Sequence, residues 1–169
     1  CSLTMRLQEL IRADKHITDG GEWKRRQKMP KTYFPLSKNK SYQIPAKWDA
    51  WRVVRFRALG CQFRLLIAFD AGYEEYRGWL ALERGSDMVL LARLEHHGSH
   101  PGWHCHANCD DPSTQTAGVV KGFGDRRIPK ARHRHRRTRF EVTEANALST
   151  AFEFFGIDGQ VGTGEGNLL

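Results

Sequence analysis

Histidines are concentrated in one stretch of the chain, from Met88 to Asp110. Five of the eight histidines fall within eleven residues there, together with Glu95, Cys105 and Cys109. An imidazole has an unperturbed pKa of about 6.5, so near neutral pH it can accept a proton, donate one or bind a metal ion. The composition of this stretch therefore indicates either acid/base catalysis or a metal site.

The two halves of this stretch alternate as β-strands do, and the turn formers between Gly98 and Gly102 predict a hairpin loop. One face would be mostly apolar, with Leu90, Ala92, Leu94, Trp103, Cys105, Ala107 and Cys109. Side chains in strands point alternately to the two faces of a sheet, so the polar side chains of both strands should share the other face. That face would carry Arg93, Glu95, His97, His104, His106 and Asn108.

Such a polar face has the groups needed to cleave RNA through its own 2′-hydroxyl: a base, an acid and a cation near the phosphate. We expect Glu95 or His97 to be the base and His104 or His106 the acid. Arg93, Arg126 and Arg127 would hold the phosphate. This set resembles, in residue types and layout only, the equipment of microbial ribonucleases and small toxin ribonucleases, which place Glu, Arg and His on an antiparallel sheet packed against helices. The favoured prediction is thus a toxin-like endoribonuclease that needs no cofactor.

A metal site is the alternative use of the same residues. His104 and His106 form an H-x-H pair, and His97 on the neighbouring strand would supply a third nitrogen, leaving a position open for water as in catalytic zinc sites. The chain would then be a metal-dependent hydrolase. A structural zinc site would instead combine histidines with Cys105 and Cys109, but a regular strand puts these cysteines on the opposite face from His104 and His106.

The charge of the chain indicates a polyanionic partner. Its 27 basic and 19 acidic residues give a formal net charge of +8, which favours RNA or DNA. Two basic clusters are candidates for binding phosphates: Lys24, Arg25 and Arg26 in the first, and Arg126, Arg127, Lys130, Arg132, Arg134, Arg136 and Arg137 in the second. The alternative is a solvated basic surface without a ligand. A non-catalytic RNA- or DNA-binding module, stabilised by zinc or not, is accordingly the second functional hypothesis.

The remaining pattern predicts one α+β domain over residues 1–157. About four or five antiparallel strands should form a meander, packed against an N-terminal helix that begins after Ser2 and a C-terminal helix capped by Thr143 and ended by Gly156. Residues 24–47 would form a basic irregular arm, because Pro30, Pro35 and Pro45 prevent a long helix. Its aromatic side chains would either anchor it to the body, which we favour, or stack on bases. Residues 121–139 form a second basic segment, and residues 158–169 a flexible Gly-rich tail.

The cellular setting can be inferred only coarsely. No apolar run approaches the roughly 20 residues that a membrane-spanning helix needs, so we expect a soluble protein with no membrane partner. Four cysteines are few for a secreted scaffold, which favours reduced thiols and the cytoplasm. For a toxin-like ribonuclease a protein inhibitor would be a further partner. The sequence does not indicate an oligomeric state.

Overall fold

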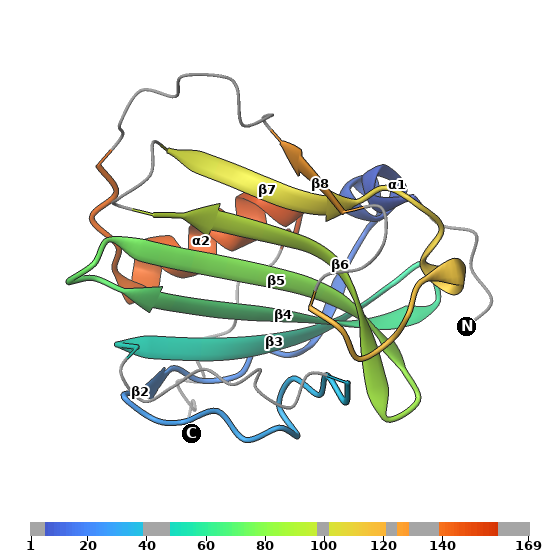
Figure 1. Cartoon of the computed structure of the whole chain (residues 1–169), viewed down its shortest axis with the longest axis horizontal. Coiled ribbons are helices and arrows are strands. Elements are labelled where there is room, and N and C mark those ends of the chain that lie inside the picture. The colour runs from blue at the N-terminus through green and yellow to red at the C-terminus, as the bar shows by residue number, and fades with distance from the viewer. Residues whose placement is uncertain (1–5, 39–47, 98–101, 121–124, 129–138, 159–169) are drawn as a thin grey trace, which may run out of the picture.

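The computed structural model describes residues 6–38, 48–97, 102–120, 125–128 and 139–158, and its centre is one antiparallel sheet (Figure 1). Five strands that follow one another in the chain form the body of this sheet: β3 (Ala50–Ala58), β4 (Cys61–Asp70), β5 (Glu75–Arg84), β6 (Asp87–His96) and β7 (Trp103–Asn108). Each of them pairs with the next one. The predicted meander and the α+β class are therefore confirmed.

Three short strands extend the sheet at its edges. β1 (His16–Asp19) and β2 (Lys24–Arg25) both pair with β3, and β8 (Asp125–Ile128) pairs with β7, which makes the sheet eight-stranded. The prediction of four or five strands was too low because strands of two to four residues are too short to show an alternating pattern. β2 also lies within the arm over residues 24–47, which we had expected to be irregular.

Two helices flank the sheet, and the second one matches its prediction closely. α2 (Glu144–Phe155) begins after Thr143, whose hydroxyl accepts a hydrogen bond of 3.3 Å from the backbone N–H of Asn146. It ends at Gly156, which adopts a left-handed conformation with φ of 63°. α1 (Leu7–Arg12) is shorter than expected, and Ser2, the predicted cap, lies outside the described residues. A short 3₁₀ turn, η1 (Pro112–Thr114), follows β7.

One face of the sheet packs against both helices and forms the larger core. Figure 1 shows α2 crossing this face behind the strands. Leu10 of α1 and Ala147, Ala151 and Phe155 of α2 are fully buried in this core. The hydroxyl of Tyr76 on β5 donates a hydrogen bond of 3.0 Å to the carbonyl of Ala147, which ties α2 to the sheet. The tail expected over residues 158–169 lies outside the described part of the chain except for Asp158.

The opposite face is covered only in part, by the segment that leads from β2 towards β3. Its apolar side chains form a second core with β3, β4 and β5, whose members from the covering segment are Met29, Phe34, Leu36 and Trp48. Phe34 is 1% exposed, which confirms that this aromatic residue anchors the arm. Tyr33 packs edge-on against Trp51, with ring centroids 5.2 Å apart. Tyr42, the third aromatic residue of the arm, is outside the described residues.

A β-bulge in β6 decides which side chains reach each face. Leu80 on β5 pairs with Ala92, but the next residue, Ala81, pairs with Leu90, so Leu91 is an extra residue. Leu91 and Ala92 consequently both face the helix-side core, and Leu90 packs at the second core. The prediction that Leu90 shares a face with Ala92 was wrong for this reason, whereas the alternation beyond Ala92 is regular.

The cysteines differ in state. Cys105, which is buried, and Cys109, which is exposed, are not in disulfides, but Cys61 is disulfide-bonded, which contradicts the expectation that the thiols are reduced. In the described part of the chain, neither α1, α2 nor any other helix combines the length and the apolar character required to cross a membrane.

Candidate active site

The register of the strands aligns the predicted polar residues in two neighbouring rows across the sheet. Residues directly opposite each other in paired strands point to the same face. The first row runs from β3 to β7 through Trp51, Ala68, Arg77, Glu95 and His104. The second row runs from β3 to β8 through Val53, Leu66, Trp79, Arg93, His106 and Arg127. Both rows begin apolar on β3 and end polar on β6 and beyond.

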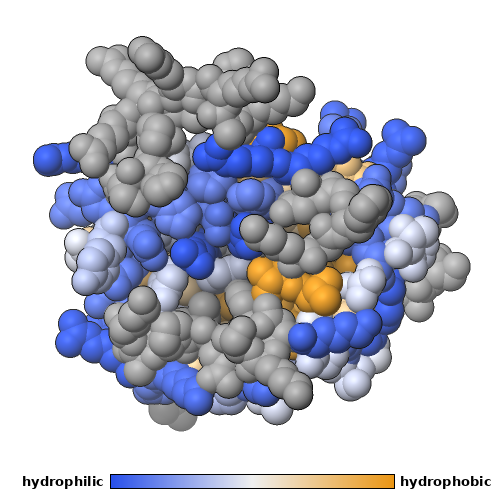
Figure 2. Space-filling view, viewed as in Figure 1, coloured by the Kyte–Doolittle hydropathy of each residue, from blue (hydrophilic) through white to orange (hydrophobic). Residues whose placement is uncertain are grey.

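The apolar beginning of each row lies under the covering segment, and the polar end is the candidate site. Trp48 marks the boundary, because its ring lies 5.2 Å from the guanidinium carbon of Arg77. In Figure 2 this face of the molecule is largely hydrophilic, with a smaller apolar patch beside the hydrophilic area. The described part of the arm thus packs on the apolar side chains of this face, and the polar side chains of the two rows lie from Arg77 on β5 to Arg127 on β8.

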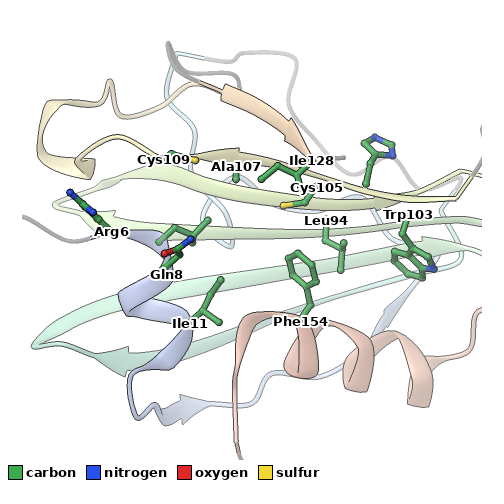
Figure 3. A pocket seen from close by; sticks show the side chains of 12 residues that line it. Arg6, Gln8, Ile11, Leu94, Trp103, Cys105, Ala107, Cys109, Ile128 and Phe154 are labelled. Atoms are coloured by element: carbon green, nitrogen blue, oxygen red, sulfur yellow. The ribbon is translucent and has the colours of Figure 1, made fainter. Parts of the chain in front are cut away.

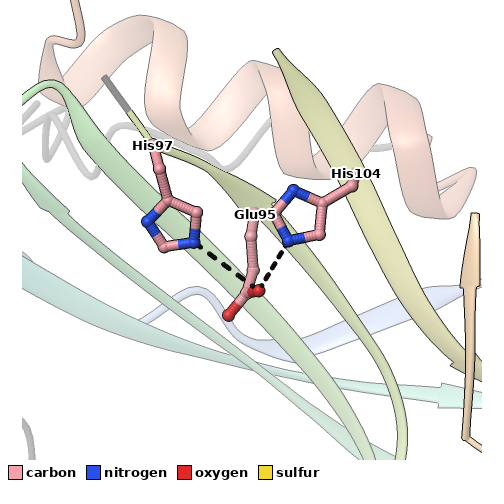
Figure 4. Close-up of side chains that lie close together, drawn as sticks. All are labelled: Glu95, His97 and His104. Atoms are coloured by element: carbon pink, nitrogen blue, oxygen red, sulfur yellow. Dashed lines mark hydrogen bonds and ion pairs between the residues drawn. The ribbon is translucent and has the colours of Figure 1, made fainter. Parts of the chain in front are cut away.

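Glu95 is the centre of the site, and its two carboxylate oxygens have different neighbours. Oε2 lies 3.0 Å from Nε2 of His104, 3.6 Å from Nε2 of His106 and 3.7 Å from Nε2 of His97. Figure 4 shows the imidazoles of His97 and His104 on either side of this carboxylate. The five residues assigned to the site from the sequence, Arg93, Glu95, His97, His104 and His106, are therefore brought together.

The other oxygen, Oε1, faces two guanidinium groups. Nε of Arg93 lies 2.8 Å away as an ion pair that is not aligned as a hydrogen bond, and Nε of Arg77 lies 3.8 Å away. Arg77 also approaches Glu75, whose carboxylate is 3.8 Å from Nδ1 of His97. Arg77 and Glu75 were not assigned to the site from the sequence. The alternation of β5 gives their face, but only the pairing of Arg77 with Glu95 places them beside the histidines.

Burial divides the site into an inner and an outer part. The side chains of Glu95 and His104 are each 7% exposed, whereas those of His97 and His106 are 18% and 20% exposed. Arg77 and Glu75 are more exposed still, at 32% and 35%. A substrate can therefore reach His97, His106 and Arg77 more readily than Glu95 or His104.

The environment holds Glu95 ionised. Burial alone would raise the pKa of this carboxyl, but hydrogen bonds from His104 and His97 and the positive charges of Arg93 and Arg77 outweigh it. The pKa of Glu95 is consequently far below its usual range. A carboxylate that holds its negative charge so firmly is a weak base, and it is well suited to orient imidazoles or to bind a cation.

A metal ion would find its ligands in the inner part of the site. Glu95, His97 and His104 each offer one donor atom, and these atoms lie within 4.8 Å of one another. The cysteines of the alternative zinc site are not part of this group among the described residues. Cys105 is buried in the helix-side core, as the strand parity predicted, and Cys109 lies beyond the end of β7.

The predicted phosphate-binding residues are spread over different parts of the molecule. Arg127 joins the second row beside His106, but its neighbour Arg126 pairs with Ala107 and so points to the helix side. Arg25 bonds Glu144 at the start of α2, and the guanidinium group of Arg26 lies 3.7 Å from the carboxylate of Asp49. Lys24 pairs with Trp51 at the start of the first row, four strand spacings or about 19 Å from Glu95. The other candidates lie outside the described residues: Lys130, Arg132, Arg134, Arg136 and Arg137.

An apolar cavity of about 720 Å³ lies on the helix side of the same hairpin. Figure 3 shows Leu94 and Cys105 of the sheet facing Ile11 of α1 and Phe154 of α2 across it. Its walls are mainly apolar, but His104, which bonds Glu95, also lines it. The cavity and the site centred on Glu95 therefore adjoin at His104.

No protein-family model, curated protein sequence or solved structure matches this chain. The fold and the site define its class by themselves: an α+β protein whose antiparallel sheet is covered by helices on one face. The other face carries a buried carboxylate surrounded by imidazoles and guanidinium groups.

Proposed function

We propose that the chain is a nucleic-acid-processing enzyme that cleaves phosphodiester bonds at the site centred on Glu95, with RNA as its substrate. One observation carries the proposal: three imidazole nitrogens lie within 3.7 Å of one carboxylate oxygen, next to two arginines, on the face of the sheet that the helices leave free. A buried carboxyl group whose pKa is shifted by neighbouring imidazoles and guanidinium groups is typical of catalytic sites.

The roles follow from exposure. In cleavage by the 2′-hydroxyl, a base takes the proton of that hydroxyl, the bond from O2′ to phosphorus forms, and the bond from phosphorus to O5′ breaks. An acid then gives a proton to O5′, so the products are a 2′,3′-cyclic phosphate and a 5′-hydroxyl. His97 and His106 are the imidazoles exposed enough to serve as base and acid. Glu95 and His104, which are more deeply buried, orient them.

The cations are assigned to the phosphate. Arg93, Arg77 and Arg127 lie on the same face as the imidazoles, in the two rows described above. Planar guanidinium groups bind phosphate oxygens in pairs and stabilise the charge that grows on them in the transition state. Arg127 pairs with His106 directly and so connects the site to the second basic cluster.

The test is cleavage of a fluorescently labelled RNA by purified protein and by variants. His106→Ala should lower the rate by about 100-fold or more, the usual contribution of a general acid or base. His16→Ala is the matched control, because His16 lies exposed on β1 at the far edge of the sheet. RNA with a 2′-deoxy residue at the cleaved position should resist. If the variant lacking both His97 and His106 cleaves RNA at the original rate, the proposal is wrong.

The same experiment examines the non-catalytic alternative. A binding module would associate with RNA or DNA in a salt-dependent manner and show no turnover at any enzyme concentration. If the original protein binds RNA without cleaving it, and the variant lacking both His97 and His106 still binds RNA, the binding module is favoured over the enzyme.

A further inference from the structure

The donor atoms of Glu95, His97 and His104 lie close enough together to be candidates for ligands of one ion. Nε2 of His104 and Nε2 of His97 lie 3.0 Å and 3.7 Å from Oε2 of Glu95, and all three atoms are within 4.8 Å of one another. Figure 4 shows both nitrogens directed at this oxygen from opposite sides. The three side chains come from two adjacent strands and from the first residue after β6, so the sheet fixes their positions.

The two imidazole contacts with Oε2 differ in length. Nε2 of His104 is within hydrogen-bond distance of Oε2, and Nε2 of His97 lies 3.7 Å from it. Donors that share one ion at about 2.1 Å are themselves separated by about 3.0 Å in octahedral and about 3.4 Å in tetrahedral geometry. The separations of 3.0 Å and 3.7 Å lie close to these values. Small rotations of the two rings would bring all three donors to one ion.

The second nitrogens of the two imidazoles have different surroundings. Ligating imidazoles generally direct this nitrogen at a carboxylate or a carbonyl. Nδ1 of His97 faces Oε1 of Glu75 at 3.8 Å, whereas the buried Nδ1 of His104 has no hydrogen-bond partner among the described residues. The carboxylate of Glu95 is held from behind by Arg93 at Oε1, which leaves Oε2 directed at the imidazoles. With 7% exposure, Glu95 and His104 are also largely shielded from competing water.

The local charge predicts what the open coordination position would bind. The positive charges of Arg77 and Arg93 are balanced by the negative charges of Glu75 and Glu95. A divalent ion added to this neutral set would leave an excess of positive charge. Three protein ligands leave a fourth position open, as in catalytic zinc sites. An anionic phosphate oxygen in that position would neutralise the excess.

We propose that Glu95, His97 and His104 bind one divalent transition-metal ion, with zinc as the preferred ion, and that the open position accepts a phosphate oxygen of the nucleic acid. The use of the ion in cleavage rests on the proposed function, but its binding does not. An ion there would polarise the phosphate or activate a bound water. His97 would then be a ligand, and His106, at 3.6 Å from Oε2, would be the imidazole left to transfer a proton.

The test begins with binding and needs no activity. Protein stripped with EDTA is titrated with Zn²⁺ in competition with a chromophoric chelator, and the expected result is about one ion per chain. His97→Ala and His104→Ala should each weaken zinc binding by at least tenfold. His106→Ala and His16→Ala should bind zinc as the original protein does. Circular dichroism of each variant confirms that it is folded, and His97→Ala, at the end of β6, is the substitution least disruptive to the core.

The outcomes separate the metal site from the enzymatic function. Absence of zinc binding, or unchanged binding in both ligand variants, would overturn the metal site. Full cleavage of RNA by EDTA-treated protein would retain the enzyme and overturn the use of the ion. Stoichiometric zinc lost in the ligand variants, without cleavage of any RNA, would support the metal site and refute the proposed function. Zinc binding combined with cleavage that His106→Ala abolishes would support both.

Discussion

Replacing Glu95 by Gln should destabilise the fold strongly, because Arg93 would lose its counter-charge in a buried place and the more exposed Arg77 would keep only Glu75. Oε1 of Glu95 lies 2.8 Å from Arg93 and 3.8 Å from Arg77, and the carboxylate side chain is 7% exposed. At an effective dielectric constant of about 20, these separations correspond to attractions of about 6 and about 4 kcal/mol before desolvation is subtracted. The amide keeps the volume and removes the charge. We expect the free energy of unfolding to fall by about 3–5 kcal/mol, as for other buried pairs that lose one partner.

The assay is urea denaturation followed by tryptophan fluorescence, in EDTA so that no metal ion contributes. Glu144→Gln is the matched control: its Oε1 lies 2.8 Å from Arg25, the same distance, but the side chain of Arg25 is 75% exposed. Removing that exposed pair should change the denaturation midpoint only slightly. The double variant Glu95→Gln/Arg93→Met should recover part of the lost stability, because one unpaired buried cation is gone. If Glu95→Gln destabilises no more than Glu144→Gln does, buried charge is not what holds this cluster.

Three further predictions concern residues that position the site. Gly156→Ala should lower the free energy of unfolding by about 2 kcal/mol or more, because φ is 63° and a Cβ would lie 2.1 Å from the carbonyl oxygen of Ile11. An unchanged melting temperature would contradict this. Leu65→Ala, at a fully buried position, should lower the free energy of unfolding by about 2–5 kcal/mol. In urea titrations the dependence of this free energy on urea concentration should change little. Trp48→Leu should lower the free energy of unfolding by about 1–2 kcal/mol, because it removes the aromatic ring that contacts the guanidinium group of Arg77. Trp48→Phe should lower it less, because an aromatic ring is kept. Equal stability of the two variants would exclude a cation–π contribution.

The hairpin of β6 and β7 was predictable from the sequence because its alternation is regular where the site lies. From Ala92 to Glu95 and from Trp103 to Ala107 every second residue faces the helix-side core, so parity separated His104 and His106 from Cys105 correctly. The C-terminal helix was also predictable, since Thr143 and Gly156 mark its ends by local chemistry. Such signals depend on residues close together in the chain.

The parts that the sequence did not predict depend on contacts between distant residues. The bulge at Leu91 leaves no mark in the composition, so Leu90 was assigned to the wrong face. Arg77 joins the site only through the register of β5 with β6, which an alternating pattern cannot specify. Arg126 and Arg127 were treated alike as basic residues, but adjacent positions on a strand point to opposite faces, and only Arg127 lies beside His106.

The division of one sheet face into an apolar and a polar half is itself an argument for function. The same two rows that end in Arg93, Glu95 and the histidines begin with side chains that pack well under the arm, such as Trp51 and Leu66. Apolar residues at the polar end could be covered in the same way, and replacing buried ion pairs by packed apolar side chains is often neutral or stabilising. A largely buried carboxylate with two arginines and three imidazoles is thus a poor means of stabilising a fold. Its presence on the part of the sheet that the described residues of the arm do not reach supports the proposals that these groups cleave a phosphodiester and bind a metal ion, since both need such groups to serve a ligand.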